Sequence, residues 1–209
     1  MDSVAYQAES RPHVTFVINS CGITGRQKTE RGKLWLTALI GRRAKKKGES
    51  DMAVFTVNGQ KVEPARNQKL LRFLRDELHL TSVKDGCSEG ACGTCHVLVD
   101  GVAMKACIPT LSMMDGRSIL TVEGFSDEEK ELYAYAFAEA GAVQCGFCTP
   151  GCIMSATEIL NAKREFSDDE IRKLMSGHLC RCTGYENILR AVKKTMLRRL
   201  GKNEEADAI

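Results

Sequence analysis

Two four-cysteine patterns constrain the fold of this 209-residue chain more strongly than any other feature. Eight of its ten cysteines belong to them, and each pattern joins closely spaced cysteines to others further along the chain. A fold that uses each pattern as one site must therefore bring four thiols together at two places. The first set is Cys87-x4-Cys92-x2-Cys95-x11-Cys107, and the second set is Cys145-x2-Cys148-x31-Cys180-x-Cys182.

The ligand count and the spacing both favour iron. Four thiolates hold a 2Fe–2S cluster, and the C-x4-C-x2-C run of the first set is the plant-type ferredoxin spacing. Three glycines accompany the three cysteines of residues 86–95, and glycine lets a backbone wrap closely around a cluster. The Cys180-x-Cys182 pair is tighter than the C-x2–4-C pairs usual for zinc. We predict two 2Fe–2S clusters on these eight cysteines, with zinc ligands or free thiols as the alternative.

Other candidate residues have structural explanations. Cys152 follows Cys148 by four residues in an apolar stretch, so we expect a core thiol. We expect His79 and His96 to serve packing or surface roles. His178 stands two residues before Cys180, where it can form a hydrogen bond near the cluster.

Composition excludes several classes of protein. The hydrophobic fraction of 43% suffices for ordinary globular cores. No run of about 18 apolar residues is present, so we expect no membrane span. The first residues lack the apolar core of a secretory signal, and clustered cysteines then favour metal binding over disulfides. We expect a cytoplasmic protein, and we find no nucleic-acid-binding motif.

Residues 1–51 differ in character from the remainder. They contain 10 Lys and Arg against 5 Asp and Glu, whereas residues 52–209 contain 20 against 22. VTFVIN at 14–19 can form a strand and LWLTALI at 34–40 a short apolar element, but neither builds a domain. We hypothesise that Met52 is the true start, because the codons before it can form a purine-rich ribosome-binding stretch. Cys21 is then a free thiol or irrelevant.

Residues 52–124 are predicted to form a small sheet with one helix. AVFTV at 53–57 alternates and is followed by Asn58-Gly59, a strong hairpin signal. NQKLLRFLRDEL at 67–78 has helical spacing. A second hairpin turns at Asp100-Gly101, and SILTVEG at 118–124 forms the last strand. Hairpin, helix, loop, hairpin and strand is the element order of a β-grasp ferredoxin-like domain.

Residues 125–200 are predicted to be helical. Ser126 with Glu129 and Ser167 with Glu170 have capping-box spacing, and Pro150 suits the first turn of another helix. A fourth amphipathic helix covers 185–200. We predict an α+β protein, with the ferredoxin-like domain followed by a four-helix bundle domain. Residues 201–209 are a polar tail that we expect to fray.

The motifs GCSEGACGTC, GAVQCGFCTPG and HLCRCTGY, in this order, resemble the iron–sulfur subunit of the molybdenum hydroxylases, the xanthine dehydrogenase and aldehyde oxidoreductase family. The resemblance covers about residues 53–195. It implies a distal cluster on the first cysteine set and a proximal cluster on the second. It also places Gln144 and Cys182 against a molybdenum-bound pterin that belongs to a large partner subunit.

The resemblance further implies a role in electron transfer, without a catalytic residue in this chain. Electrons would leave the molybdenum–pterin site, pass through the proximal and then the distal cluster, and reach FAD, usually on a third subunit. The motif neighbourhood favours purine or xanthine dehydrogenases, with aldehyde, N-heterocycle or carbon monoxide dehydrogenases as alternatives. A free-standing redox carrier or sensor and a zinc-stapled module are hypotheses of other classes.

Overall fold

The computed structural model describes residues 53–209, all of which belong to one unit of the chain. Residues 1–52 lie outside the described part. The predictions made for them, including the strand at 14–19, the apolar element at 34–40, the role of Cys21 and the start at Met52, therefore lie outside it as well.

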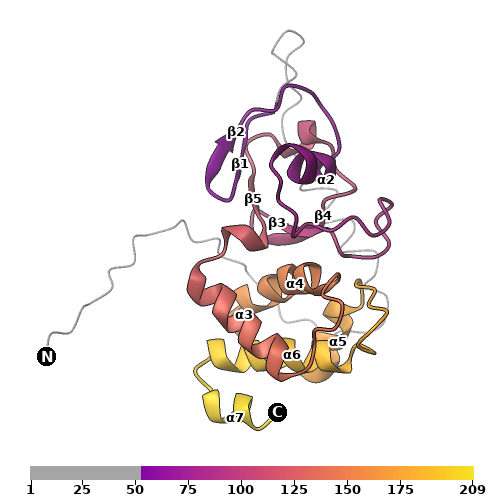
Figure 1. Cartoon of the computed structure of the whole chain (residues 1–209). Helices are drawn as coiled ribbons and strands as arrows, with labels where there is room; N and C mark the ends of the chain where they lie inside the picture. Colours follow the sequence, from indigo (N-terminus) through magenta and orange to yellow (C-terminus); the bar gives the residue numbers. More distant parts are fainter. Residues whose placement is uncertain (1–52) are drawn as a thin grey trace, which may run out of the picture. The chain divides into compact units, whose positions relative to one another are not determined.

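A five-stranded mixed sheet forms the first half of the described chain (Figure 1). The strand order is β2-β1-β5-β3-β4; β1 and β5 are parallel, and the other neighbours are antiparallel. The last strand of the segment therefore lies in the middle of the sheet and joins the two hairpins. The strands are β1 (Phe55–Val57), β2 (Gln60–Val62), β3 (His96–Val99), β4 (Val102–Lys105) and β5 (Ser118–Leu120).

Both hairpins turn at the predicted dipeptides. Asn58 and Gly59 have φ values of 51° and 82°, and Asp100 and Gly101 have values of 51° and 84°. Two successive residues with positive φ form the type I′ turn, whose twist matches that of the flanking strands. The sequence prediction of two hairpins is confirmed.

The helix after the first hairpin is short and partly irregular. It begins as α2 (Leu70–Arg72) and continues as one π-helical turn, η1 (Phe73–Glu77), closed by a bond from Leu78 N to Phe73 O of 3.1 Å. Its buried side chains face the sheet, and the Phe73 ring packs edge-on against Phe55 at 5.8 Å. We predicted a regular helix here; the wider turn keeps both Phe73 and Leu74 buried.

Five helices form the second half, one more than predicted. Two short 3-10 turns, η2 (Leu111–Met114) and η3 (Val122–Gly124), precede them. Ser126 and Ser167 cap their helices with both bonds of the capping box present, as the sequence predicts. The helices are α3 (Asp127–Glu139), α4 (Thr149–Asn161), α5 (Asp168–Met175), α6 (Glu186–Arg199) and α7 (Asn203–Asp207).

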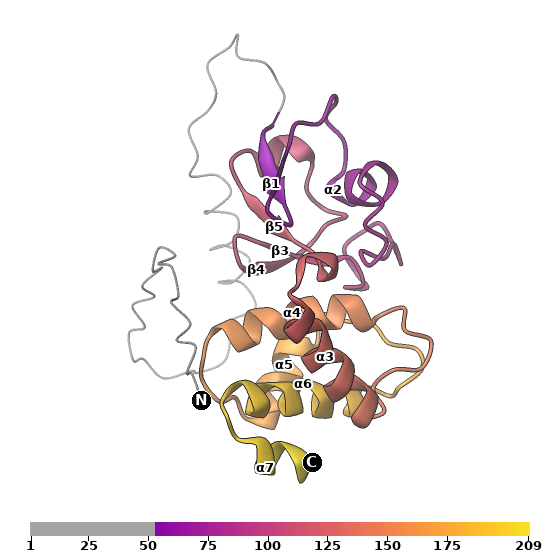
Figure 2. The same ribbon diagram turned by 60° about the vertical axis from the view of Figure 1, so that its left-hand side comes forward.

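Helix α4 is the centre of the described fold. It contacts β3 and β4 on one side and α5 and α6 on the other, and the views in Figures 1 and 2 show it between the sheet and the remaining helices. Nine of its thirteen residues are buried, as expected for a helix that is apolar on all faces. Because α4 belongs to the cores of both halves, the position of its first turn is fixed relative to the sheet.

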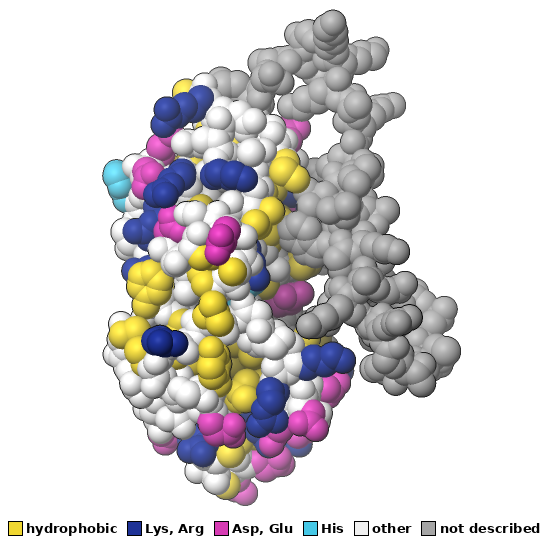
Figure 3. All heavy atoms as spheres, turned by 90° about the vertical axis from the view of Figure 1, so that its right-hand side faces the viewer, with side chains coloured by type: hydrophobic (Ala, Val, Ile, Leu, Met, Phe, Trp, Pro, Cys, Tyr) yellow, Lys and Arg dark blue, Asp and Glu magenta, His cyan; other side chains and the backbone are white. Residues whose placement is uncertain are grey.

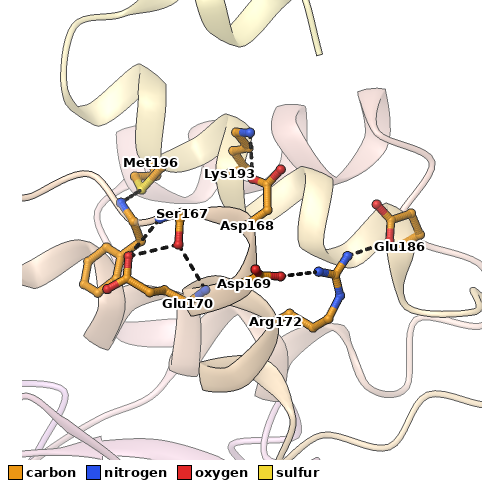
Figure 4. Close-up of polar contacts among 9 residues, drawn as sticks. Ser167, Asp168, Asp169, Glu170, Arg172, Glu186, Lys193 and Met196 are labelled. Atoms are coloured by element: carbon orange, nitrogen blue, oxygen red, sulfur yellow. Dashed lines mark hydrogen bonds and ion pairs between the residues drawn. The ribbon is translucent and has the colours of Figure 1, made fainter. Parts of the chain in front are cut away.

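Helices α5 and α6 are joined by polar contacts as well as by packing (Figure 4). Lys193 lies 2.6 Å from Asp168, and Arg172 lies 3.4 Å from Glu186. Before α5, the Phe166 amide donates to Met196 Sδ at 3.2 Å. These contacts hold α5 against α6, and the loop between the two helices contains Cys180 and Cys182.

The expectation of a frayed tail at 201–209 was wrong. Residues 203–207 form α7, with Ala206 fully buried. Asp207 pairs with Arg198 of α6, and Lys202 pairs with Glu165 at 2.7 Å. Asp207 and Arg198 are nine residues apart and Lys202 and Glu165 are 37 apart, so neither pair shows as a one-turn helical spacing in the sequence. Within residues 53–209, no helix combines the length and the apolar character that crossing a membrane requires.

Candidate functional site

The first cysteine set gathers around the loop between η1 and β3. Cys92 and Cys95 are buried in it, and Cys87 is half-buried at its start. The β3–β4 hairpin brings Cys107 to the same place, because Ala106 N donates to Cys95 O at 3.0 Å. The fourth thiol therefore reaches the site through strand pairing.

Backbone amides point at the most accessible sulfur of this set. Cys92 N lies 3.4 Å from Cys87 Sγ. Hydrogen bonds from the amides of Cys92 and Glu89 lower the pKa of Cys87 to about 7. Burial raises the pKa of the Cys95 thiol to about 12. Amide donors stabilise the thiolate form, which is the form that binds a metal.

Gly86 and Gly93 keep this loop tight. A Cβ on Gly86 would lie 2.9 Å from Cys92 Sγ, and one on Gly93 would lie 2.5 Å from the carbonyl oxygen of Gly177. Gly93 also has a φ of 76°, which side chains other than glycine tolerate poorly. The loop could not approach its neighbours as closely with larger residues.

The second set lies at two breaks between helices. Cys145 and Cys148 precede α4, and Cys148 is its N-cap residue. Cys180 and Cys182 lie between α5 and α6. The two loops meet: Cys182 Sγ is 3.4 Å from Cys145 Sγ, and the thiols of Cys148 and Cys180 interact directly. The x31 gap is thus one passage along α4 and back along α5.

Local hydrogen bonds support the sulfur atoms of this set. Thr183 N donates to Cys180 Sγ at 3.4 Å. A hydrogen bond from the Cys152 thiol, followed by one from Cys180, lowers the pKa of Cys148 to about 6, and the same contact raises the pKa of Cys152. Cys152 is fully buried, so the prediction of a core thiol is confirmed.

In both sets the thiols approach one another in pairs. Within residues 53–209, no group of three or more His, Cys, Asp or Glu side chains is arranged to hold a metal ion. A 2Fe–2S cluster takes two cysteines on each of two irons, so an arrangement of two pairs fits it. The pairs are Cys87 with Cys92, Cys95 with Cys107, Cys145 with Cys182, and Cys148 with Cys180.

The loops of the two sets contact each other directly. Leu179 N donates to Cys92 O at 2.9 Å, which links a residue beside Cys180 to a cysteine of the first set. A Cβ on Gly151, in the first turn of α4, would lie 2.5 Å from Gly93 O. The two candidate sites are therefore neighbours joined by the main chain.

Two family models match the described chain. The 2Fe-2S iron-sulfur cluster binding domain matches residues 55–118, and the 2Fe-2S binding domain matches residues 121–193. The nicotinate dehydrogenase small FeS subunit of Eubacterium barkeri is 47% identical over 128 residues, covering 61% of this chain and 82% of that protein. The xanthine dehydrogenase iron-sulfur-binding subunit of Escherichia coli O157:H7 is 43% identical, with coverages of 66% and 89%.

This chain belongs to the 2Fe–2S small subunits of the molybdenum hydroxylases. A solved structure agrees: a chain of quinoline 2-oxidoreductase from Pseudomonas putida 86 superposes with a TM-score of 0.63 at 40% identity. That match covers 75% of this chain and 96% of the other. The small subunit therefore has two 2Fe–2S domains and serves an oxidoreductase.

In this small subunit the two sets differ in exposure. Cys145 and Cys182 are exposed, whereas Cys92, Cys95 and Cys107 are buried. Gln144 is exposed beside Cys145. Figure 3 shows one face of the molecule, on which hydrophobic side chains gather toward the middle. The exposed apolar residues next to the second set are Val143, Phe147, Leu179 and Tyr185.

Sequence reasoning missed the contact between two histidines of the small subunit. The rings of His96 and His178 lie 4.5 Å apart, and His178 Nε2 is 2.8 Å from Ser155 Oγ of α4. Burial lowers the pKa of His178 to about 3, and the charges of His96 and Lys105 act in the same direction. Burial also lowers the pKa of His96. The sequence signal for this contact was that His96 directly follows Cys95 and that His178 stands two residues before Cys180.

Proposed function

We propose that this chain carries electrons between the molybdenum subunit and the acceptor of a hydroxylase complex. The main-chain bond between Leu179 N and Cys92 O carries this proposal, because it joins the two cysteine sets. When bound, each 2Fe–2S cluster accepts and releases one electron at a time. The chain itself holds the thiolates and buries four of the eight.

We further propose the ligands and domains. Residues 52–124 form the ferredoxin-like β-grasp domain, and residues 125–200 form a four-helix bundle domain. The thiol pairs described above and the amides aimed at Cys87 support this assignment. The first domain binds its cluster through Cys87, Cys92, Cys95 and Cys107, and the second through Cys145, Cys148, Cys180 and Cys182.

The partner of the second set is proposed to be the large subunit that binds a molybdenum–pterin cofactor. The proposed contact surface surrounds the second cysteine set, because its exposed thiols stand beside exposed apolar side chains, and exposed apolar patches with a polar rim mark docking surfaces. The residues are Cys145, Cys182, Phe147 and Leu179. Gln144 and Cys182 are proposed to face the pterin. The acceptor is proposed to be FAD on a further subunit, in the cytoplasm.

The substrate is proposed to be a nitrogen heteroaromatic compound. Nicotinate, xanthine and quinoline, the compounds in the names of the three proteins compared above, all belong to this class. Purines are nitrogen heteroaromatic compounds too, so a purine substrate agrees with this proposal. An aldehyde stays the alternative, because aldehyde oxidoreductases are also among the similar solved structures.

A reconstituted complex tests the function. The small subunit and its large partner are co-purified, and reduction by nicotinate, xanthine, quinoline and an aldehyde is followed by EPR of the iron–sulfur signals. We expect two distinct 2Fe–2S signals to appear with a heteroaromatic substrate. A colourless small subunit that contains zinc instead of iron would contradict the electron-transfer proposal. Reduction by the aldehyde alone would contradict only the substrate class.

A further inference from the structure

Lys105 places a positive charge against the loop of the first cysteine set. It ends β4 and pairs with His96 of β3 in the antiparallel register. From there its ammonium donates to Gly90 O at 2.7 Å. Gly90 lies between Cys87 and Cys92, and Lys105 itself precedes Cys107 by two residues. Strand pairing therefore fixes this charge beside the ligand loop.

The charge of Lys105 has no carboxylate counterpart in the described part of the chain. Its ammonium makes no ion pair within residues 53–209, although the side chain is half-buried. By comparison, buried Lys194 pairs with Glu139 at 2.6 Å, and Asp85 of the cysteine loop pairs with Arg72 at 3.0 Å. A partly buried charge that lacks a partner acts more strongly on other nearby charges, because water screens it less.

An electron that enters the first site adds one negative charge beside this ammonium. We propose that the Lys105 ammonium raises the reduction potential of the first-set cluster and so draws the electron away from the second set. In this step the second-set cluster is oxidised by one electron and the first-set cluster is reduced by one, with no bond or proton exchanged. This inference rests on the proposed function.

Lys69 offers a weaker version of the same arrangement. Its ammonium donates to Ile108 O at 2.8 Å, next to Cys107, but the side chain is exposed. Salt and water screen an exposed charge more effectively. We therefore expect Lys69 to act in the same direction with a smaller effect.

The variants Lys105→Gln, Lys105→Arg, Lys69→Gln and Lys61→Gln in the assembled complex test the proposal. Lys61 is the control, because it lies on β2 at the opposite edge of the sheet, four strand spacings or about 19 Å from β4. The readout is a potentiometric titration in which EPR follows each cluster separately. The titration is run at low and at high ionic strength.

In a complex that holds one electron, the ratio of reduced first-set cluster to reduced second-set cluster should fall about tenfold in Lys105→Gln. This corresponds to a decrease of about 59 mV in the reduction potential of the first-set cluster relative to the second. Lys105→Arg should restore the wild-type partition, Lys69→Gln should shift it less, and Lys61→Gln should leave it unchanged. The Lys69 shift should shrink with added salt.

Three results would overturn the inference. The first is an unchanged partition in Lys105→Gln with both EPR signals intact. The second is an equal shift of both clusters, and the third is a shift that Lys105→Arg fails to reverse, which would indicate loop packing instead of charge. A protein that loads no 2Fe–2S cluster at all would instead overturn the proposed function.

Discussion

Single cysteines of this chain are proposed to have different roles despite their similar surroundings. Cys148 and Cys152 lie one helical turn apart, and both are buried. The spacing patterns include Cys148 and leave Cys152 out, although the structure places both within the apolar core around α4. Substitution of single cysteines can distinguish a cluster ligand from a thiol that only packs in the core.

We predict that Cys92→Ser loses about half of the bound iron, because one of two clusters depends on this thiolate. Cys152→Ala should keep all of the iron and lower the free energy of unfolding by about 1 kcal/mol, as small buried truncations do. Iron analysis and chemical denaturation measure the two effects. Equal iron loss in both variants would contradict the assignment.

Gly93 lies at a close approach between the loops of the two sets. We predict that Gly93→Ala lowers the free energy of unfolding by about 3 kcal/mol, from left-handed backbone strain and a clash with Gly177 O. Gly101→Ala is the matched control, with a φ of 84° and open space around its Cβ. It should cost about 1 kcal/mol. Urea denaturation measures both variants. If Gly93→Ala and Gly101→Ala lower the free energy of unfolding equally, the packing between the two loops does not contribute to stability.

Some residues were predictable and others were not. The spacing of Cys87, Cys92 and Cys95 predicts that these thiols lie close together, because one short loop carries all three, whereas Cys107 arrives through strand pairing. Lys105 and the contact between His96 and His178 were not predictable, because they arise from strand register and from α4 packing on the sheet. No local pattern encodes such a juxtaposition.

At the level of elements, two capping boxes start the helices on either side of α4. Ser126 accepts from Glu129 N at 3.2 Å, and Ser167 accepts from Glu170 N at 3.3 Å. Both were predictable because all the interacting groups lie within four residues. The π-helical turn of η1 and helix α7 were not, since each depends on partners elsewhere in the fold.

We predict that Ser126→Ala and Ser167→Ala each lower the free energy of unfolding by about 1 kcal/mol, because each leaves a helix amide without its acceptor. Ser176→Ala is the control, since its exposed hydroxyl only donates to Lys173 O at the end of α5. It should change stability by less than about 0.5 kcal/mol. Denaturation of the cluster-loaded protein measures all three. A larger loss in Ser176→Ala would contradict the capping argument.

At the level of the whole described unit, the two cysteine sets connect segments that are distant in sequence. The second set ties the start of α4 to the start of α6, and the first ties a loop to the end of a hairpin. With the proposed ligands, bound clusters would therefore act as cross-links in addition to the shared core around α4. Ligands that bind only the folded state stabilise it.

We predict that removing iron with a chelator under anaerobic, reducing conditions lowers the free energy of unfolding by about 3 kcal/mol or more, as loss of cross-links does. Amide hydrogen exchange should increase first in residues 86–95 and 177–185, with α4 protected for longest. Uniform exchange throughout residues 53–209 would contradict the view that the clusters stabilise mainly these loops.

The exposure of the second set has a consequence for how the subunit is made. Cys145 and Cys182 are both exposed, and their sulfur atoms lie 3.4 Å apart. Before iron arrives, this pair is a dithiol that an oxidant can close into a disulfide. Maturation therefore has to follow an order, in which iron and sulfide are inserted under reducing conditions before air reaches the chain. In the proposed complex, the large subunit would then cover the finished centre and protect it.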